Sequence, residues 1–133
     1  MLTIPIILKE FPGKGIGLTA AHAIKKGDVI WKRNWDFTKK FTRAEVEKMD
    51  KIQQDFINKY TYFIKNNKNI HYFDCDDSRF MNHSSKPNTE YDENYSEGHA
   101  TRDIAEGEEI TCDYNKLGGV DFTDVEGVKS TGI

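Results

Sequence analysis

Two polar stretches decide how this chain of 133 residues folds, Arg79-Phe-Met-Asn-His-Ser84 and Gly107-Glu-Glu-Ile-Thr-Cys-Asp-Tyr114. The first lies within Asp74–Asn88, which is too polar and irregular for a regular element, and the second contains a short predicted strand. Around them, thirteen Ile, five Val, eight Phe, six Tyr and two Trp accompany only four Leu and six Ala. Because β-branched and aromatic side chains favour strands, the sequence predicts a mainly β fold.

Outward from these stretches, the pattern predicts six strands and one helix. The helix begins at Thr42, because Thr42-Arg-Ala-Glu45 forms a capping box in which the Thr hydroxyl accepts the Glu45 amide. It ends near Lys65, and its apolar residues are expected to form one buried face: Val46, Met49, Ile52, Phe56 and Ile57. The predicted strands are Thr3–Glu10, Ile16–Ala20, Val29–Lys32, Ile70–Phe73, His99–Ile104 and Glu109–Tyr114.

Composition limits the classes of protein that fit. The length is that of a single domain, so one hydrophobic core is expected. The formal net charge is −3, with 19 Lys and Arg against 22 Asp and Glu, so direct nucleic-acid binding is not expected. Two Cys and no apolar leader predict reduced thiols and an intracellular protein, cytoplasmic or nuclear. No apolar run approaches the roughly 18 residues that cross a bilayer, so no membrane partner is expected.

The sequence contains residues for three other kinds of site: a dinucleotide site, a Cys–His catalytic pair and a metal site. Gly15-Ile-Gly-Leu-Thr-Ala20 has the G-x-G-x-x-A form of a dinucleotide fingerprint, which keeps a Rossmann oxidoreductase as an alternative. Too few residues precede Gly27, however, for the crossover helix of that fold. Cys75 and His83 could form a nucleophile and base, but no third orienting group is identifiable. The acidic, His and Cys residues around Asp74 lack metal-ligand spacing, so no metal site is predicted.

Taken together, the two polar stretches resemble the signature motifs of SET-domain protein lysine methyltransferases. Lys14-Gly-Ile-Gly17 and Ala23-Ile-Lys-Lys-Gly27-Asp28 resemble the N-terminal motif of that family, in the same order along the chain. This resemblance implies a mainly β, β-clip-like SET fold with one inserted α-helix and a C-terminal pseudoknot. In such folds the loop matching Ser84–Asn88 lies over the threaded last motif. We expect a catalytic domain over 1–115 and a tail over 116–133 that is a docking arm or disordered.

S-adenosylmethionine is the cofactor that the resemblance implies. In the family it lies against the backbone of the glycine motif and against the Asn-His pair, an approach that the missing Cβ atoms of Gly15 and Gly17 permit. Arg79 could pair with the cofactor carboxylate, and holding its own loop is the alternative role. The residues expected at the cofactor are Lys14, Gly15, Ile16, Gly17, Arg79, Asn82 and His83.

By the same resemblance, Tyr114 takes the catalytic position where the cofactor meets the lysine channel; a buried tyrosine at a strand end is the alternative. Cys112 stands where many members have Phe or Tyr, which leaves product specificity open. Tyr91 could project its hydroxyl into the channel or belong to the core. No Cys lies between Tyr114 and Ile133, so we expect no zinc-binding segment of the kind that follows the last motif in many members. Phe122, the only aromatic residue of the tail, is the candidate that closes the channel.

An acidic segment gives a separate indication of the substrate. Between Glu90 and Asp113, nine acidic residues face only Arg102, a local balance of 1 − 9 = −8. Such a field attracts a Lys-rich peptide, so we expect a basic protein or a histone-like tail as the substrate; a solvated acidic loop is the alternative. A non-catalytic SET-fold peptide-binding module is the rival to the enzyme, and in so small a protein a homodimer could complete the site.

Overall fold

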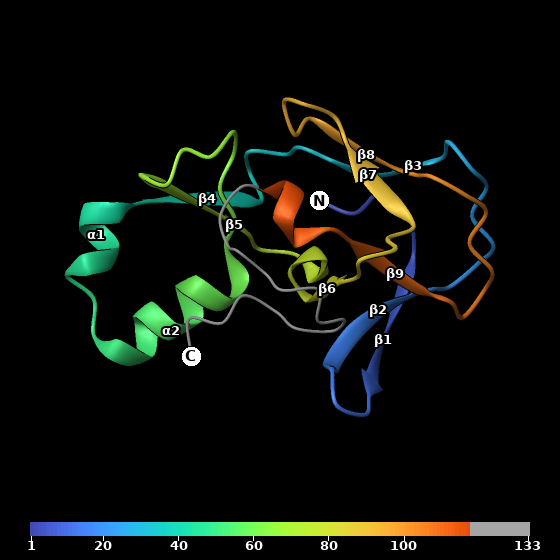
Figure 1. The fold of residues 1–133 in the computed structure, drawn as a ribbon, viewed down its shortest axis with the longest axis horizontal. Coiled ribbons are helices and arrows are strands. Elements are labelled where there is room, and N and C mark those ends of the chain that lie inside the picture. Colours follow the sequence, from blue (N-terminus) through green and yellow to red (C-terminus); the bar gives the residue numbers. More distant parts are fainter. Residues whose placement is uncertain (118–133) are drawn as a thin grey trace.

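Short strands arranged in three small sheets form the frame of the molecule in the computed structural model, which describes residues 1–117 (Figure 1). The first sheet has the order β1-β2-β9-β6, the second β3-β8-β7, and β4 pairs with β5 alone. The predicted mainly β fold is confirmed. The strands are β1 (Ile6–Phe11), β2 (Gly15–Ala20), β3 (Val29–Lys32), β4 (Thr38–Thr42), β5 (Ile70–Asp74), β6 (Asn82–His83), β7 (Thr89–Tyr91), β8 (Glu97–Ala100) and β9 (Glu109–Cys112).

Each of the six predicted strands overlaps an observed one, whereas β4, β6 and β7 were not predicted. β4 shows why, because two consecutive lysines, Lys39 and Lys40, interrupt any apolar alternation and are both exposed. It is a strand because β5 pairs with its whole length, from Thr38↔Asp74 to Thr42↔Ile70. Pairing with a distant segment therefore overrides the local pattern.

The single predicted helix from Thr42 to Lys65 is wrong, since two helices occupy this region: α1 (Arg43–Glu47) and α2 (Lys51–Tyr60). Thr42 does cap the first, accepting the Glu45 amide at 3.1 Å. Asp50 then starts the second helix with its own capping box to Gln53. The expected apolar face is divided as a result.

The apolar residues of the two helices differ in their exposure to solvent. Val46 and Ile57 are buried, while Ile52 is 82% exposed and Phe56 is 43% exposed. Helical spacing across residues 42–57 places these side chains on one face only if the helix is continuous. Because a new helix begins after Asp50, Ile52 lies on an exposed face instead. No helix within residues 1–117 is long and apolar enough to cross a membrane.

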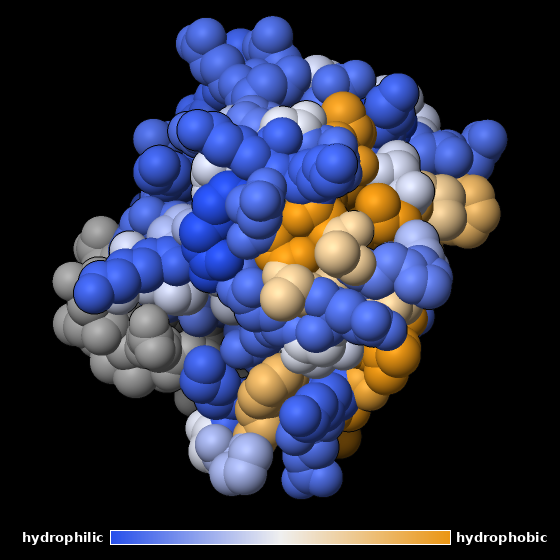
Figure 2. Space-filling model, turned by 90° about the vertical axis from the view of Figure 1, so that its right-hand side faces the viewer, coloured by the Kyte–Doolittle hydropathy of each residue, from blue (hydrophilic) through white to orange (hydrophobic). Residues whose placement is uncertain are grey.

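The core lies where β2, β3 and β9 meet, around Leu18, Ile30, Trp31, Ile104 and Ile110, all at most 2% exposed. Most of the face seen in Figure 2 is hydrophilic, with a band of apolar side chains across it. The exposed apolar residues of the β1–β2 hairpin are Ile7, Leu8 and Ile16.

The pseudoknot expected at Ser84–Asn88 is built from β6, β9 and the amide of Asn88. β6 runs parallel to β9, with Asn82 opposite Thr111, although the two segments are far apart in sequence. Asn88, 1% exposed, accepts from the Thr111 backbone N–H at 2.9 Å and donates to the Glu109 carbonyl at 2.8 Å. The Asn88 side chain therefore fastens the loop to β9 through both the oxygen and the nitrogen of its amide.

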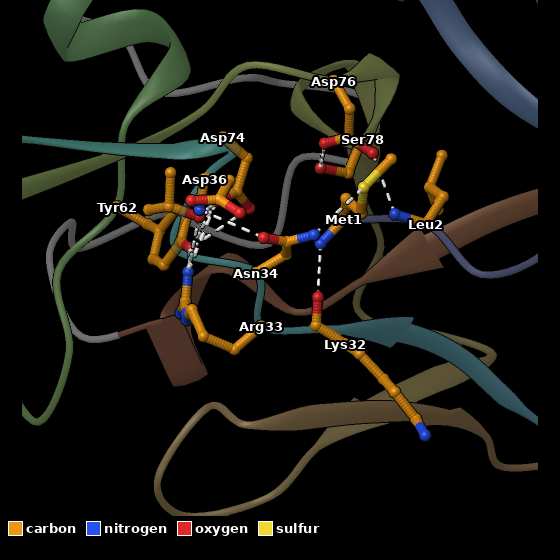
Figure 3. A network of polar contacts seen from close by, with 11 residues as sticks. Met1, Leu2, Lys32, Arg33, Asn34, Asp36, Tyr62, Asp74, Asp76 and Ser78 are labelled. Carbon is orange, nitrogen blue, oxygen red and sulfur yellow. Dashed lines mark hydrogen bonds and ion pairs between the residues drawn. The ribbon is translucent and has the colours of Figure 1, made fainter.

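A buried ion pair joins the β4–β5 ladder to the end of β3 (Figure 3). Arg33 Nη1 lies 3.3 Å from Asp74 Oδ1, and the Tyr62 hydroxyl donates to the same carboxylate at 2.9 Å. The guanidinium also stacks over Trp31, 4.6 Å from the ring centroid. Tyr62 in turn contacts Tyr95, with ring centroids 6.5 Å apart, so the network supports the aromatic residues that border the site.

Candidate active site

Tyr114, the predicted catalytic residue, lies two residues after the end of β9, at the start of the short helix η2 (Tyr114–Leu117). Its hydroxyl donates to the Met81 carbonyl at 2.5 Å, and its backbone N–H donates to His83 Nδ1 at 3.0 Å. Nδ1 of His83 therefore acts as the acceptor of this bond. The two signature stretches thus meet through Tyr114, Met81 and His83.

Tyr91 contacts the side chain of Met81, with its hydroxyl 3.5 Å from the Met81 sulfur. Its ring packs edge-on against Trp31 at 5.4 Å and stacks with Tyr95 at 5.9 Å. Gly98 makes room for this ring, since a Cβ there would come within 2.7 Å of it. The structure therefore brings Tyr91 and Tyr114 together around one methionine, and it also gives Tyr91 core contacts.

Burial raises the pKa of Tyr91 and of Tyr114 well above their ordinary value near 10. Both hydroxyls are consequently neutral at physiological pH, and neither is a base. Tyr91 also lines a pocket of about 30 Å³, enough for roughly one water molecule. Its lining residues are Thr89, Glu90, Tyr91, Tyr95, Asp113 and Lys116.

The glycine motif forms the turn and first residues of the β1–β2 hairpin. Gly15 has φ +80° and open space where a Cβ would stand, so its backbone is available to a ligand. At Gly17 the space is taken by protein instead, because a Cβ would lie 2.5 Å from Glu109 Oε2 and 2.7 Å from Asn82 Nδ2. The missing Cβ of Gly17 therefore leaves room for the side chains of Glu109 and Asn82. From the sequence, this space was expected to let the cofactor approach the backbone.

Asn82 supplies the observation that tests whether a polar cofactor fits here. The residue is 0% exposed, and its Nδ2 donates to Glu109 Oε2 at 2.8 Å. Its Oδ1 is buried and has no hydrogen-bond partner within residues 1–117. A buried acceptor of this kind suits a ligand with N–H or O–H donors, as S-adenosylmethionine has. Glu109, which sequence reasoning did not place in the site, also pairs with Lys14 at 3.4 Å.

The remaining predicted site residues have distinct surroundings. Arg79 stacks over Phe80 at 4.8 Å and over Tyr60 at 5.9 Å, contacts that fit its structural alternative. Cys112 is buried and pairs with His83 across β6 and β9. Ile16 is 46% exposed. Phe122 and most of the predicted tail lie outside the described residues.

Some carboxylates of the acidic segment are held by contacts within the protein and are less available to a substrate. Glu109 is engaged with Asn82 and Lys14, and Glu108 pairs with Arg102 at 2.7 Å. The exposed acidic residues of the segment are Glu90, Asp92, Glu93, Glu97, Asp103 and Glu106. Among residues 1–117, no group of three or more His, Cys, Asp or Glu side chains is arranged to hold a metal ion.

The sequence of this chain matches a known family, and its fold matches known proteins. The family profile described as the SET domain matches residues 15–115, which is more than half of the chain. The chain belongs to the SET-domain family. The match begins at Gly15, inside the glycine motif, and covers both signature stretches, so the resemblance noted in the sequence is confirmed.

Solved structures share the fold of this SET domain. Chaetomium thermophilum Polycomb Repressive Complex 2, in an autoinhibited conformation bound to S-adenosylmethionine, matches 86% of the chain with a TM-score of 0.63 and 18% identity. The Neurospora SET domain protein DIM-5, a histone lysine methyltransferase, matches 85% of it with a TM-score of 0.59 and 19% identity. This SET domain spans only 15% and 53% of those chains. No curated protein matches its sequence.

Proposed function

We propose that this SET domain is an S-adenosylmethionine-dependent protein lysine N-methyltransferase. The observation that carries the proposal is the position of Tyr114, whose hydroxyl is held by the Met81 carbonyl beside the Asn82–His83 strand. Membership of the SET-domain family and the fold shared with histone lysine methyltransferases support it.

The residues around Met81 suit methyl transfer by positioning rather than by acid–base chemistry. Bound S-adenosylmethionine supplies a methyl group attached to a positively charged sulfur. The Tyr114 hydroxyl is fixed by its bond to the Met81 carbonyl and would orient the lysine amine, and nearby carbonyl oxygens can accept weak C–H contacts. Held at the glycine motif and Asn82, the cofactor would give this methyl group to the lysine nitrogen, and its sulfur would leave with the electron pair as a neutral thioether.

The lysine must be neutral before it attacks. An apolar site lowers the pKa of an amine because it disfavours the charged form, which makes the loss of the proton easier near neutral pH. Tyr91 and Tyr114 are neutral hydroxyls with raised pKa values, so they do not take up this proton. We expect the proton to leave to solvent.

Methyl transfer tests this proposal directly. The purified protein is incubated with methyl-labelled S-adenosylmethionine and either histones or a mixed cell lysate, and labelled residues are identified by mass spectrometry. Label on lysine is the expected result. Measurable cofactor binding without transfer to any protein would contradict the enzyme and favour the non-catalytic peptide-binding module.

We further propose that the substrate is basic, because the exposed carboxylates Glu90, Asp92, Glu93 and Glu97 lie on or between β7 and β8, the strands next to Tyr91. Lys116 lies 3.9 Å from Glu90 and Lys32 lies 3.8 Å from Glu97, so this group keeps a negative balance. Reversing two of them, in the double variant Glu93→Lys and Glu97→Lys, should lower kcat/KM for a Lys-rich peptide by about tenfold at low salt and about twofold at high salt. Steady-state kinetics across a salt series measure this effect.

A matched variant controls for net charge. Glu10→Lys with Glu45→Lys reverses two exposed acids outside the segment and should change kcat/KM by less than about twofold. Kinetics of the Glu93 and Glu97 variant that equal wild type at every salt concentration would contradict a docking role and favour the solvated loop.

Tyr91 is proposed to limit the number of methyl groups added. Its hydroxyl occupies space 3.5 Å from the Met81 sulfur, so Tyr91→Phe should open room beside the amine and shift the products towards higher methylation states. Mass spectrometry of the methylated peptide over time measures the shift, with Tyr72→Phe as the control. An unchanged product distribution would assign Tyr91 to the core alone.

A further inference from the structure

Glu109 holds the amide of Asn82 from the side opposite to the unpaired oxygen. Its Oε2 accepts from Asn82 Nδ2 at 2.8 Å, while its Oε1 lies 3.4 Å from Lys14 Nζ. The Glu109 side chain is only 13% exposed, and Asn82 is fully buried. These contacts link the glycine motif, the first signature stretch and β9.

The chemistry of the pair decides which way the amide points. An ionised carboxylate only accepts hydrogen bonds, so the NH₂ group of Asn82 must face Glu109. Oδ1 then points away from it, and this atom is buried without a hydrogen-bond partner in the described part of the chain. Leaving a buried acceptor unpaired is unfavourable, which indicates that a ligand donor completes the site.

Gly17 keeps the pair close to the β2 backbone. Any side chain at this position would overlap both Glu109 Oε2 and Asn82 Nδ2. Because packing and charge both act on the same amide, the orientation of Asn82 is set before a ligand arrives, and binding need not reorganise it.

We propose that Glu109 is a positioning residue that fixes the Asn82 amide so that its carbonyl oxygen is presented to a hydrogen-bond donor of the cofactor. The inference rests on the proposed function, since the ligand is S-adenosylmethionine or its product. Glu109 does not touch the reacting atoms. It acts through Asn82 alone.

The test combines an exchange pair of variants with two measurements. Glu109→Gln lets the Asn82 amide adopt either orientation, and Asn82→Asp places two carboxylates face to face. In the double variant the Gln amide donates to the new Asp, whose second oxygen takes the place of Oδ1. Affinity is measured by calorimetry with S-adenosylhomocysteine, and exchange of the Asn82 side-chain amide protons is measured by NMR in the unliganded protein.

Each single variant should bind S-adenosylhomocysteine at least about tenfold more weakly than wild type, and the double variant should return to within about threefold. Glu109→Gln should also speed amide exchange at Asn82 by at least about tenfold. The control Glu106→Gln, an exposed glutamate nearby, should alter neither measurement by more than about twofold. Thermal unfolding verifies that every variant is folded.

Three results would overturn the inference: unchanged affinity in Glu109→Gln, unchanged amide exchange in Glu109→Gln, or a folded double variant no better than the single ones. Should Asn82→Asp fail to fold, Glu109→Gln with the NMR measurement still decides. A wild-type protein that binds neither the cofactor nor its product would overturn the proposed function and the ligand half of the inference. Amide exchange in the unliganded protein then still reports whether Glu109 orients Asn82.

Discussion

Tyr114→Phe is expected to lower kcat for methyl transfer at least about 100-fold while leaving cofactor affinity within about threefold of wild type. The variant removes the hydroxyl that the Met81 carbonyl holds at 2.5 Å and nothing else. Loss of one well-placed polar group at a reacting centre typically costs this much, because its effect is greatest in the transition state. Single-turnover transfer to a lysine peptide and calorimetry with S-adenosylhomocysteine measure the two quantities.

The pH dependence adds a second check on Tyr114. Since burial keeps its pKa well above 10, the wild-type rate should show no ionisation of this tyrosine between about pH 7 and 10. Tyr72→Phe is the matched control, a half-buried tyrosine on β5 that should retain wild-type kcat. A folded Tyr114→Phe with more than about a third of wild-type kcat would remove Tyr114 from the chemistry.

Asn88→Ala should lower the free energy of unfolding by about 3 kcal/mol, the largest effect on stability that we predict. The change leaves the Thr111 N–H and the Glu109 carbonyl without their partners at 2.9 Å and 2.8 Å. Each unpaired buried group costs roughly 1–3 kcal/mol. Urea unfolding measures the difference, and Tm should fall by roughly 10 °C.

A loosened pseudoknot should also affect the site, because β9 carries Glu109 and leads directly to Tyr114. We expect Asn88→Ala to weaken S-adenosylhomocysteine binding even where it remains folded. Asn69→Ala, at an exposed asparagine, should change stability by less than about 0.5 kcal/mol. If Asn88→Ala destabilises by less than about 1 kcal/mol, water replaces the amide and the loop is held by other contacts.

The local part of the fold was accessible from the sequence. The cap at Thr42 and the strand over Val29–Lys32 appear at the predicted residues, since neighbouring side chains and backbone amides determine them. The break at Asp50 is also encoded locally, in the capping box Asp50-Lys-Ile-Gln53, which a prediction based on the apolar spacing alone leaves out. As a result, Ile52 was predicted to be buried, whereas it is exposed.

The site was predicted unevenly for a similar reason. Resemblance pointed to Tyr114, Asn82 and His83, which the structure brings together, yet nothing in a single sequence indicates which side chains share a hydrogen bond. Glu109 could have been suspected only from its place in the last signature stretch, as a carboxylate on a strand whose other residues are buried.

The sequence by itself determined the β-rich class, the separate strand and cap positions, and the family whose motifs it carries. Only the tertiary structure decided that Glu109 meets Asn82 across 27 positions and that Tyr114 meets Met81 across 33. Strand pairing and side-chain orientation depend on two distant segments at once, and the amide of Asn88 fixes one such pairing. Short-range propensities act within a few residues and hold no information about which distant partner completes a contact.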